Sequence, residues 1–299
     1  MADKVPNEVV AGGGGANPEG GGSAAGGVAA RRVVLTIAGF DPSGGAGVTA
    51  DLKTIAAYRA YGVACITALT VQSTQGVRRT EPVAAELVRD TLACLVEDVE
   101  LSAIKIGMLG TAGVVLVVSG FLRGLGRTVP VVLDPVLRSS SGRQLLDAAG
   151  LAAMRGELLG LVDWVTPNTD ELGALTGRVE GGGLPREQIA QSAAELQQEV
   201  ERQTGGQLNV VVTGGDLEPP DDYLLTATGA RLWLAGERVE TTSTHGTGCA
   251  FSSALACELA LGNGPVMAVR AAKEYVAGAM RAAYPVGKGR GPMDHFWRG

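Results

Sequence analysis

The most constraining feature of this sequence is a regular alternation of two kinds of segment from about residue 31 onward. Short runs rich in β-branched residues, such as residues 32–39 (RVVLTIAG) and 208–215 (LNVVVTGG), alternate with longer segments whose apolar residues recur at helical spacing. A chain built in this order forms a mostly parallel sheet covered by helices. The sequence therefore predicts an α/β fold.

The expected elements can be placed by residue number. Strands are predicted at 32–39, 62–72, 103–109, 129–136, 163–168 and 208–215, and a hairpin at a sheet edge at 221–228 and 230–240. Helices are predicted at 48–62, 82–98, 113–126, 148–162, 185–203, 248–260 and 265–283. The polar, turn-prone residues 73–82 (STQGVRRTEP) are a candidate lid.

The first thirty residues differ in composition from the rest of the chain. They are rich in glycine and lack both a basic start and the continuous apolar segment of a secretory signal, so a disordered extension is predicted at 1–30. Residues 31–299 are predicted to form one domain. No stretch reaches the roughly 20 apolar residues of a membrane span, so no membrane partner is expected.

Charge and cysteine content exclude several classes of function. A net charge of −6 without any basic run gives no electrostatic surface for a nucleic-acid partner. The four cysteines lack metal or redox spacing, which fits a reducing cytoplasm. Two histidines are too few for a multi-histidine metal centre.

Polar residues and glycines follow six of the predicted strands. In open parallel sheets ligands bind at the carboxyl ends of the strands, so these residues are candidates for a common site. Each of them alone is also compatible with an ordinary turn or helix cap. At the end of the first strand the candidate is the stretch TIAGFDPSGGAG at residues 36–47. At the following strands the candidates are Gln72, Gly107 with Met108, Asp134, Asn168 with Glu171, and Thr213 with Gly215.

The segment at residues 243–249 (STHGTGC) carries the strongest local signal. Gly246, Thr247 and Gly248 lead into an apolar helix, so unpaired backbone N–H groups and the helix dipole favour an anion such as a phosphate there. Cys249 lies in the first turn, where the pKa of a thiol tends to fall and the side chain can act on protons or as a nucleophile. A small buried cysteine behind a capping loop is the alternative.

Several motifs together resemble the hydroxymethylpyrimidine and phosphomethylpyrimidine kinases of thiamine biosynthesis, within the ribokinase-like superfamily. The resemblance covers nearly all of residues 31–299. The motifs are GFDPSGGAGVTADLKTIAAYRAYGVACITALTVQSTQGV, KIGMLG, VVLDPVLRSSSG, VTPNTDE, STHGTGC and GKGRGPMDHFW, in this order.

The resemblance implies a three-layer α/β/α sandwich and an enzyme that uses ATP with Mg²⁺. It implies phosphorylation of the hydroxymethyl group of 4-amino-5-hydroxymethyl-2-methylpyrimidine and then of the monophosphate to the diphosphate, and it favours a homodimer. A pyridoxal kinase is an alternative, because pyridoxal is also a small heteroaromatic ring with a hydroxymethyl group. A nucleotide-binding regulatory protein without turnover is a second alternative.

The resemblance also implies roles for individual residues. Gln72 would hydrogen-bond the pyrimidine edge, since one amide offers both a donor and an acceptor, and Gly39, Asp51 and Met108 would line the same pocket. Asp134 and Glu171 are hard oxygen ligands suited to Mg²⁺. Asn168 would help place Mg²⁺ and phosphates, Thr213 and Gly215 would lie at the nucleotide, and Gly246, Thr247, Gly248 and Cys249 would serve the transfer itself.

Cys249 favours the vitamin-kinase branch, because most sugar-kinase relatives carry an aspartate at this position. Three departures from the family pattern bear on ligand preference. Thr213 in VTGGD stands where a lysine is common, Phe40 stands where a small hydroxyl residue is usual, and Arg138 with residues 139–141 replaces a segment that often contains lysine.

Overall fold

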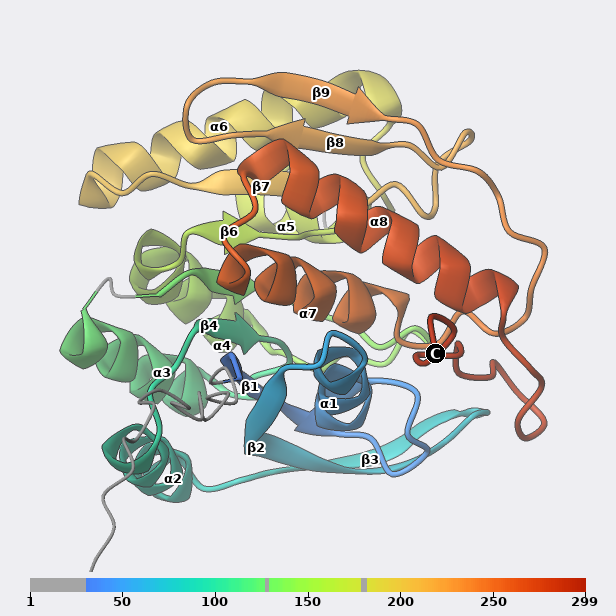
Figure 1. Cartoon of the computed structure of the whole chain (residues 1–299). Coiled ribbons are helices and arrows are strands. Elements are labelled where there is room, and N and C mark those ends of the chain that lie inside the picture. Colours follow the sequence, from blue (N-terminus) through green and yellow to red (C-terminus); the bar gives the residue numbers. More distant parts are fainter. Residues whose placement is uncertain (1–30, 127–128, 179–181) are drawn as a thin grey trace, which may run out of the picture. The chain divides into compact units, whose positions relative to one another are not determined.

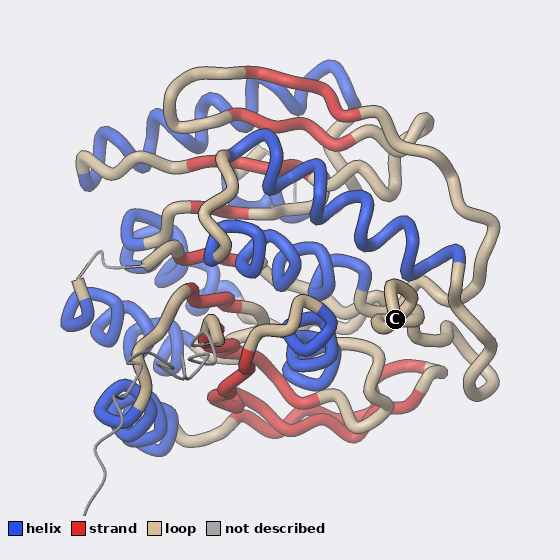
Figure 2. Tube along the Cα trace, in the orientation of Figure 1, coloured by secondary structure: helices blue, strands red, loops and turns tan. Residues whose placement is uncertain are grey.

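A nine-stranded, mostly parallel sheet runs through the computed structural model, which describes residues 31–126, 129–178 and 182–299 (Figures 1 and 2). The strand order is β3-β2-β1-β4-β5-β6-β7-β8-β9, in which β3, β8 and β9 are antiparallel to their neighbours and the other pairs are parallel. The strands are β1 (Val33–Phe40), β2 (Tyr61–Ser73), β3 (Gly76–Pro82), β4 (Ala103–Ile106), β5 (Val131–Leu133), β6 (Trp164–Val165), β7 (Asn209–Val212), β8 (Asp222–Leu225) and β9 (Arg231–Leu234).

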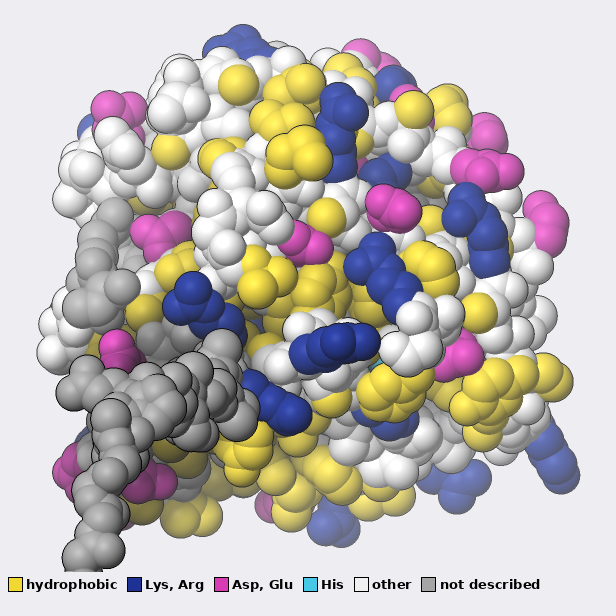
Figure 3. Space-filling view, viewed as in Figure 1, with side chains coloured by type: hydrophobic (Ala, Val, Ile, Leu, Met, Phe, Trp, Pro, Cys, Tyr) yellow, Lys and Arg dark blue, Asp and Glu magenta, His cyan; other side chains and the backbone are white. Residues whose placement is uncertain are grey.

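Helices cover both faces of this sheet, and each face has its own apolar core. One face carries α1 (Gly47–Ala57), α7 (Thr247–Ala260) and α8 (Pro265–Arg281), which lie in front in Figure 1. On the surface of that face, acidic and basic side chains are scattered among apolar ones (Figure 3). The other face carries α2 (Ala85–Asp98), α3 (Ala112–Leu125), α4 (Ala148–Ala153), α5 (Thr169–Thr176) and α6 (Arg186–Thr204). The predicted α/β/α sandwich is confirmed.

Most predicted elements are present, including the edge hairpin as β8 and β9, and three local differences have physical reasons. Residues 76–82 form strand β3, a mainly exposed edge strand whose polar sequence hides the usual apolar alternation. The helix predicted over 148–162 divides into α4, a π turn (Met154–Leu158) and a 3₁₀ turn (Leu159–Leu161), in a stretch weakened by glycines. Helix α5 was missed because it is short.

Residues 31–299 form one compact unit. The extension predicted at residues 1–30 lies outside the described residues. Among the residues described, no helix is both long and apolar enough to cross a bilayer.

A fully buried ion pair joins the centre of the sheet to the helices on one of its faces. Lys105 on β4 donates to both carboxylate oxygens of Asp51 on α1, at 3.0 and 2.9 Å, and neither side chain is exposed. Thr36 on β1 and Ser253 on α7 donate to the same carboxylate at 2.6 and 2.8 Å. Four elements therefore meet at one carboxylate, whose bonds compensate the desolvation of its charge.

We expect Lys105→Met to lower the free energy of unfolding by about 3–5 kcal/mol, because it leaves Asp51 as an uncompensated buried charge. Urea denaturation measures this difference. Adding Asp51→Asn to that variant removes the second charge and is expected to recover part of the loss. The control is Arg79→Met, which breaks an exposed pair with Glu81 at 3.6 Å and should change little. Equal losses in the two single variants would contradict the prediction.

Candidate active site

The carboxyl ends of β1, β2 and β4 to β7 lie at one edge of the sheet, because these strands run in parallel. Several residues predicted from separate motifs are adjacent there. A Cβ on Gly39 would lie 2.8 Å from the sulfur of Met108, and one on Gly248 would lie 3.9 Å from Asp134 Oδ2. Asn168 and Thr213 are paired by a parallel bridge. The structure thus places the candidates along one edge.

The start of α7 has the geometry predicted for an anion site. Gly246 precedes the helix with a φ of 81°, and no side chain caps the first amides. A Cβ at Gly246 would lie 1.9 Å from the carbonyl oxygen of Gly45, so only glycine fits between the two loops. The uncapped N–H groups after Gly246 are therefore available to an anion at this edge.

Gly39, Met108 and Gln72 are the residues expected to line the acceptor pocket, and Gln72 lies at the end of β2. The exclusion of a side chain at Gly39 lets Met108 lie directly against the backbone. Asp51 is different, because it is fully buried and its carboxylate is held by Lys105 beneath the pocket. Since Asp51 exposes no atom to a bound ring, we do not assign it to the pocket wall and regard it as part of the support below.

Two buried carboxyl groups, Asp134 and Glu171, lie near each other, and Asp134 accepts from the hydroxyl of Ser252 on α7 at 3.3 Å. Burial raises the pKa of Asp134 to about 6, although Lys105 lies near enough to oppose this. Burial, together with the neighbouring Asp134, raises the pKa of Glu171 to about 8. Glu171 accepts from the backbone N–H of Asn168 at 2.9 Å, and Asn168 caps Glu171 in return at 2.8 Å. This capping box fixes both side chains at the start of α5.

This pair of acids fits the expected magnesium ion. Both groups supply only oxygen donors, and their raised pKa values indicate a site where negative charge lacks compensation. The described residues contain no group of three or more His, Cys, Asp or Glu side chains able to enclose a metal. Mg²⁺ takes few carboxylates and completes its shell with water and phosphate oxygens, so its binding would need only these two acids from the protein.

The ionisation of Cys249 differs from the sequence-based expectation. A position in the first turn of a helix favours a lowered thiol pKa, but burial raises the pKa of Cys249 to about 12, and Lys105 offsets this only in part. Desolvation therefore outweighs the helix dipole. The resting side chain is a thiol, which can donate or accept a hydrogen bond.

The loop after β7 joins the nucleotide-side candidates. Thr213 donates its backbone N–H to the carbonyl of Pro167 at 2.9 Å, next to Asn168. Gly215 is exposed, and its carbonyl accepts from Arg238 Nη1 at 3.0 Å. Arg238 thus brings a guanidinium to the loop that contains Thr213, which stands where a lysine is common. The sequence motifs did not single out Arg238.

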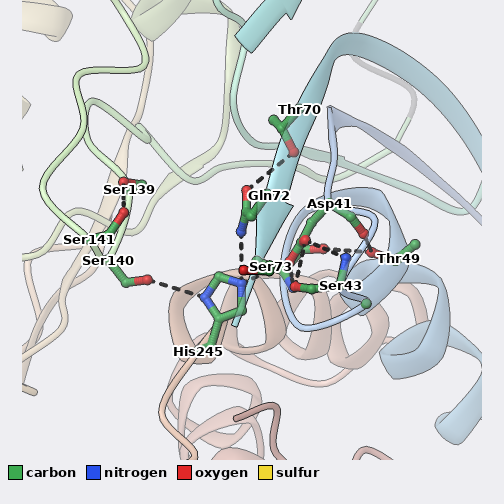
Figure 4. A network of polar contacts seen from close by, with 12 residues as sticks. Asp41, Ser43, Thr49, Thr70, Gln72, Ser73, Ser139, Ser140, Ser141 and His245 are labelled. Carbon is green, nitrogen blue, oxygen red and sulfur yellow. Dashed lines mark hydrogen bonds and ion pairs between the residues drawn. The ribbon is translucent and has the colours of Figure 1, made fainter. Parts of the chain in front are cut away.

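A second group that sequence reasoning missed surrounds His245 (Figure 4). His245 contacts Asp41 from the loop after β1, Gln72 from β2 and Ser140 from the segment after β5. Its presence within STHGTGC was the only signal, because the contacts join residues far apart in sequence. Asp41 also accepts from the N–H groups of Ser43 and Ala46, and these bonds fix the turn after β1.

The segment after α8 returns to this site. Gly291 accepts from the backbone N–H of His245 at 3.2 Å, and Gly289 donates to Thr74 Oγ1 at 3.2 Å. Arg290 donates to the carbonyl of Ser140 at 3.2 Å. Residues 289–291 therefore connect the β2–β3 turn with the segment after β5.

The sandwich fold, the uncapped glycine-rich helix start and the two carboxyl groups define a ribokinase-like small-molecule kinase. Residues 41–294 match the phosphomethylpyrimidine kinase family, and the chain belongs to that family. It is 40% identical to a hydroxymethylpyrimidine/phosphomethylpyrimidine kinase of Streptomyces coelicolor over 89% of this chain and 94% of that protein.

Two solved structures illustrate the structural similarity. A pyridoxal kinase of Staphylococcus aureus in complex with ADP has a TM-score of 0.79 and 30% identity, and the match covers 90% of this chain and 95% of that one. A phosphomethylpyrimidine kinase of Clostridium difficile has a TM-score of 0.70 and 31% identity, covering 83% and 98%.

We expect Glu171→Gln to make stability less dependent on pH. A carboxyl group whose pKa is higher in the folded state loses stabilisation as pH rises from its usual 4.5 to about 8. Gln preserves the capping box without the charge, so the variant should gain roughly 2 kcal/mol or more relative to wild type across this window and keep the gain above it. Thermal and urea unfolding at several pH values measure this.

The control for Glu171→Gln is Glu97→Gln at an exposed position of α2. Mg²⁺ should narrow the difference between wild type and Glu171→Gln, because a bound cation compensates the carboxylate. A difference that is constant from pH 4.5 to 8 would show that Glu171 is not desolvated in this way.

Proposed function

We propose that this protein transfers the γ-phosphoryl group of ATP to the hydroxymethyl group of 4-amino-5-hydroxymethyl-2-methylpyrimidine, and then phosphorylates the monophosphate to the diphosphate. The observation that carries the proposal is the close approach of Gly45 and Gly246. This contact holds the loop after β1, which is proposed to line the acceptor pocket, next to the uncapped start of α7. Thiamine biosynthesis, for which other relatives are named, is the proposed context.

Phosphoryl transfer demands mainly positioning and charge neutralisation. The amides after Gly246 would hold the transferring group, while Gln72, Gly39 and Met108 would orient the ring. Asp134 and Glu171 would hold Mg²⁺, which when bound neutralises phosphate charge. The substrate oxygen would form its bond to the γ-phosphorus as the bond to the leaving ADP breaks, and the hydroxyl proton would pass to water.

Cys249 is proposed to assist that hydroxyl. Because its pKa of about 12 keeps the thiol protonated at neutral pH, it would act first as a hydrogen-bonding partner that orients the hydroxyl. Asn168, Thr213 and Gly215 would line the nucleotide side. We further propose a homodimer in the cytoplasm, where the four free cysteines would stay reduced.

The first test is ADP release with hydroxymethylpyrimidine, its monophosphate and pyridoxal measured side by side. We expect the highest kcat/KM with the two pyrimidines, because the edge of the Gln72 amide offers a matched donor and acceptor. Preferential turnover of pyridoxal would overturn the proposal. Binding of ATP and ligand without any turnover would instead identify a regulatory protein, an alternative motivated by Thr213 at the lysine position.

The second test concerns the thiol. Cys249→Ala is expected to lower kcat by about a hundredfold while KM changes only a few fold, because the thiol acts on the reacting oxygen rather than on the ring. Cys249→Ser should recover part of kcat if a hydrogen bond suffices. The exposed Cys94→Ala serves as the control. An unchanged kcat in Cys249→Ala would remove the residue from the mechanism.

A further inference from the structure

His245 is the centre of a polar network that joins four segments (Figure 4). The imidazole is 8% exposed. Its Nε2 lies 2.8 Å from Asp41 Oδ2 and 3.0 Å from Gln72 Nε2, and its Nδ1 lies 3.2 Å from Ser140 Oγ. The side chain thus touches the residue proposed to read the substrate ring.

The hydrogen on the imidazole can be assigned from Asp41. Burial raises the pKa of Asp41, but hydrogen bonds from His245 and Ser43 outweigh it and hold the pKa below its usual value. The ionised carboxylate can only accept hydrogen bonds. Its Oδ1 accepts from the N–H and the hydroxyl of Ser43, and its Oδ2 accepts from the N–H of Ala46. His245 Nε2 must therefore carry a hydrogen to donate to Asp41 Oδ2. In the neutral ring Nδ1 is then free to accept from a hydroxyl.

This assignment conflicts with a Gln72 amide whose nitrogen faces His245. Two N–H groups would then meet at 3.0 Å with no acceptor between them. A second conflict lies at the other end of the amide, where Gln72 Oε1 is 3.3 Å from the Thr70 hydroxyl. That hydroxyl has one hydrogen, which it donates to the carbonyl of Phe40 at 3.0 Å.

A half-turn of the Gln72 amide removes both conflicts. The one hydrogen on His245 Nε2 is then shared between Asp41 Oδ2 and Gln72 Oε1. The Gln72 amide nitrogen donates to Thr70 Oγ1, which still donates to Phe40. Every group has a complementary partner. Because an amide oxygen can accept twice and an amide nitrogen can donate twice, Gln72 keeps one acceptor and one donor for a ligand.

We propose that His245, held by Asp41, is a positioning residue that fixes this orientation of Gln72 and thereby selects the order of donor and acceptor on the substrate ring. This inference rests on the proposed function. With the hydroxymethyl group directed to Gly246–Gly248, which follows His245 in sequence, the adjacent ring amine meets Gln72 Oε1. The ring nitrogen beyond it then meets Gln72 Nε2–H.

The 4-oxo analogue of the substrate, 5-hydroxymethyl-2-methyl-4(3H)-pyrimidinone, offers the reverse order: an oxygen acceptor next to the hydroxymethyl group, then an N–H donor. With Gln72 fixed, this analogue would place like groups against each other. Such mismatches leave polar groups unpaired and are strongly rejected. Without His245, the amide could turn to suit either ring.

The kinetic test measures kcat/KM for the amino compound and for its 4-oxo analogue in wild type, His245→Leu and His245→Gln. Wild type should prefer the amino compound, and His245→Leu should reduce that preference in kcat/KM about tenfold or more, mainly through a higher KM for the amino compound. His245→Gln should retain the preference, because one side-chain NH₂ can donate to both Asp41 and Gln72. A merely structural role would lower kcat/KM for both compounds alike, and that result would overturn the inference.

A second measurement does not depend on turnover. The chain has two histidines, so ¹⁵N spectra of the imidazoles in the full protein are simple, and His245→Gln identifies the His245 signals. We expect a hydrogen on Nε2 of His245, where the ring contacts Asp41. Hydrogen on Nδ1 alone would overturn the inference. Failure of wild type to phosphorylate either pyrimidine would refute the proposed function and leave this spectroscopic result as a separate outcome.

Discussion

The contact between the backbones of Gly45 and Gly246 is the constraint on which the site depends. It leaves no room for a Cβ at Gly246, so the loop after β1 lies directly against the start of α7. One loop is proposed to wall the acceptor pocket, and the other exposes uncapped amides. A side chain at Gly246 would force the two loops apart, and transfer between bound reactants tolerates very little displacement.

Beneath this contact, the buried charges are unevenly distributed. Lys105 is committed to Asp51 by an ion pair that also receives Thr36 and Ser253. Asp134 and Glu171 keep raised pKa values because burial desolvates both carboxyl groups, and Lys105 opposes this only for Asp134. The carboxyl edge of the sheet therefore holds two acidic groups whose negative charge is not compensated. A divalent cation bound with nucleotide phosphates would neutralise that charge.

The fold could be predicted from the sequence to a large extent, because alternating apolar runs determine strands and helices locally. The edge strand β3 was missed, since its polar residues need no buried face. Motif positions such as Asn168 and Thr213 were correctly expected at strand ends, and the structure places them side by side. The burial of Asp51 and the raised pKa of Cys249 could not be predicted, because both depend on packing between distant segments. The same holds for the partners of His245.

Substrate choice cannot follow from the fold alone. Solved structures named as pyridoxal kinase and as phosphomethylpyrimidine kinase resemble this chain at nearly the same identity, and both share its sheet and helices. Both rings carry a hydroxymethyl group, so phosphoryl transfer to that group would not distinguish them. Discrimination would come from the polar edge of the ring, which Gln72 is proposed to read because its amide offers both a donor and an acceptor. Its selectivity depends in turn on what holds the amide still, and the groups in contact with it are Thr70 and His245.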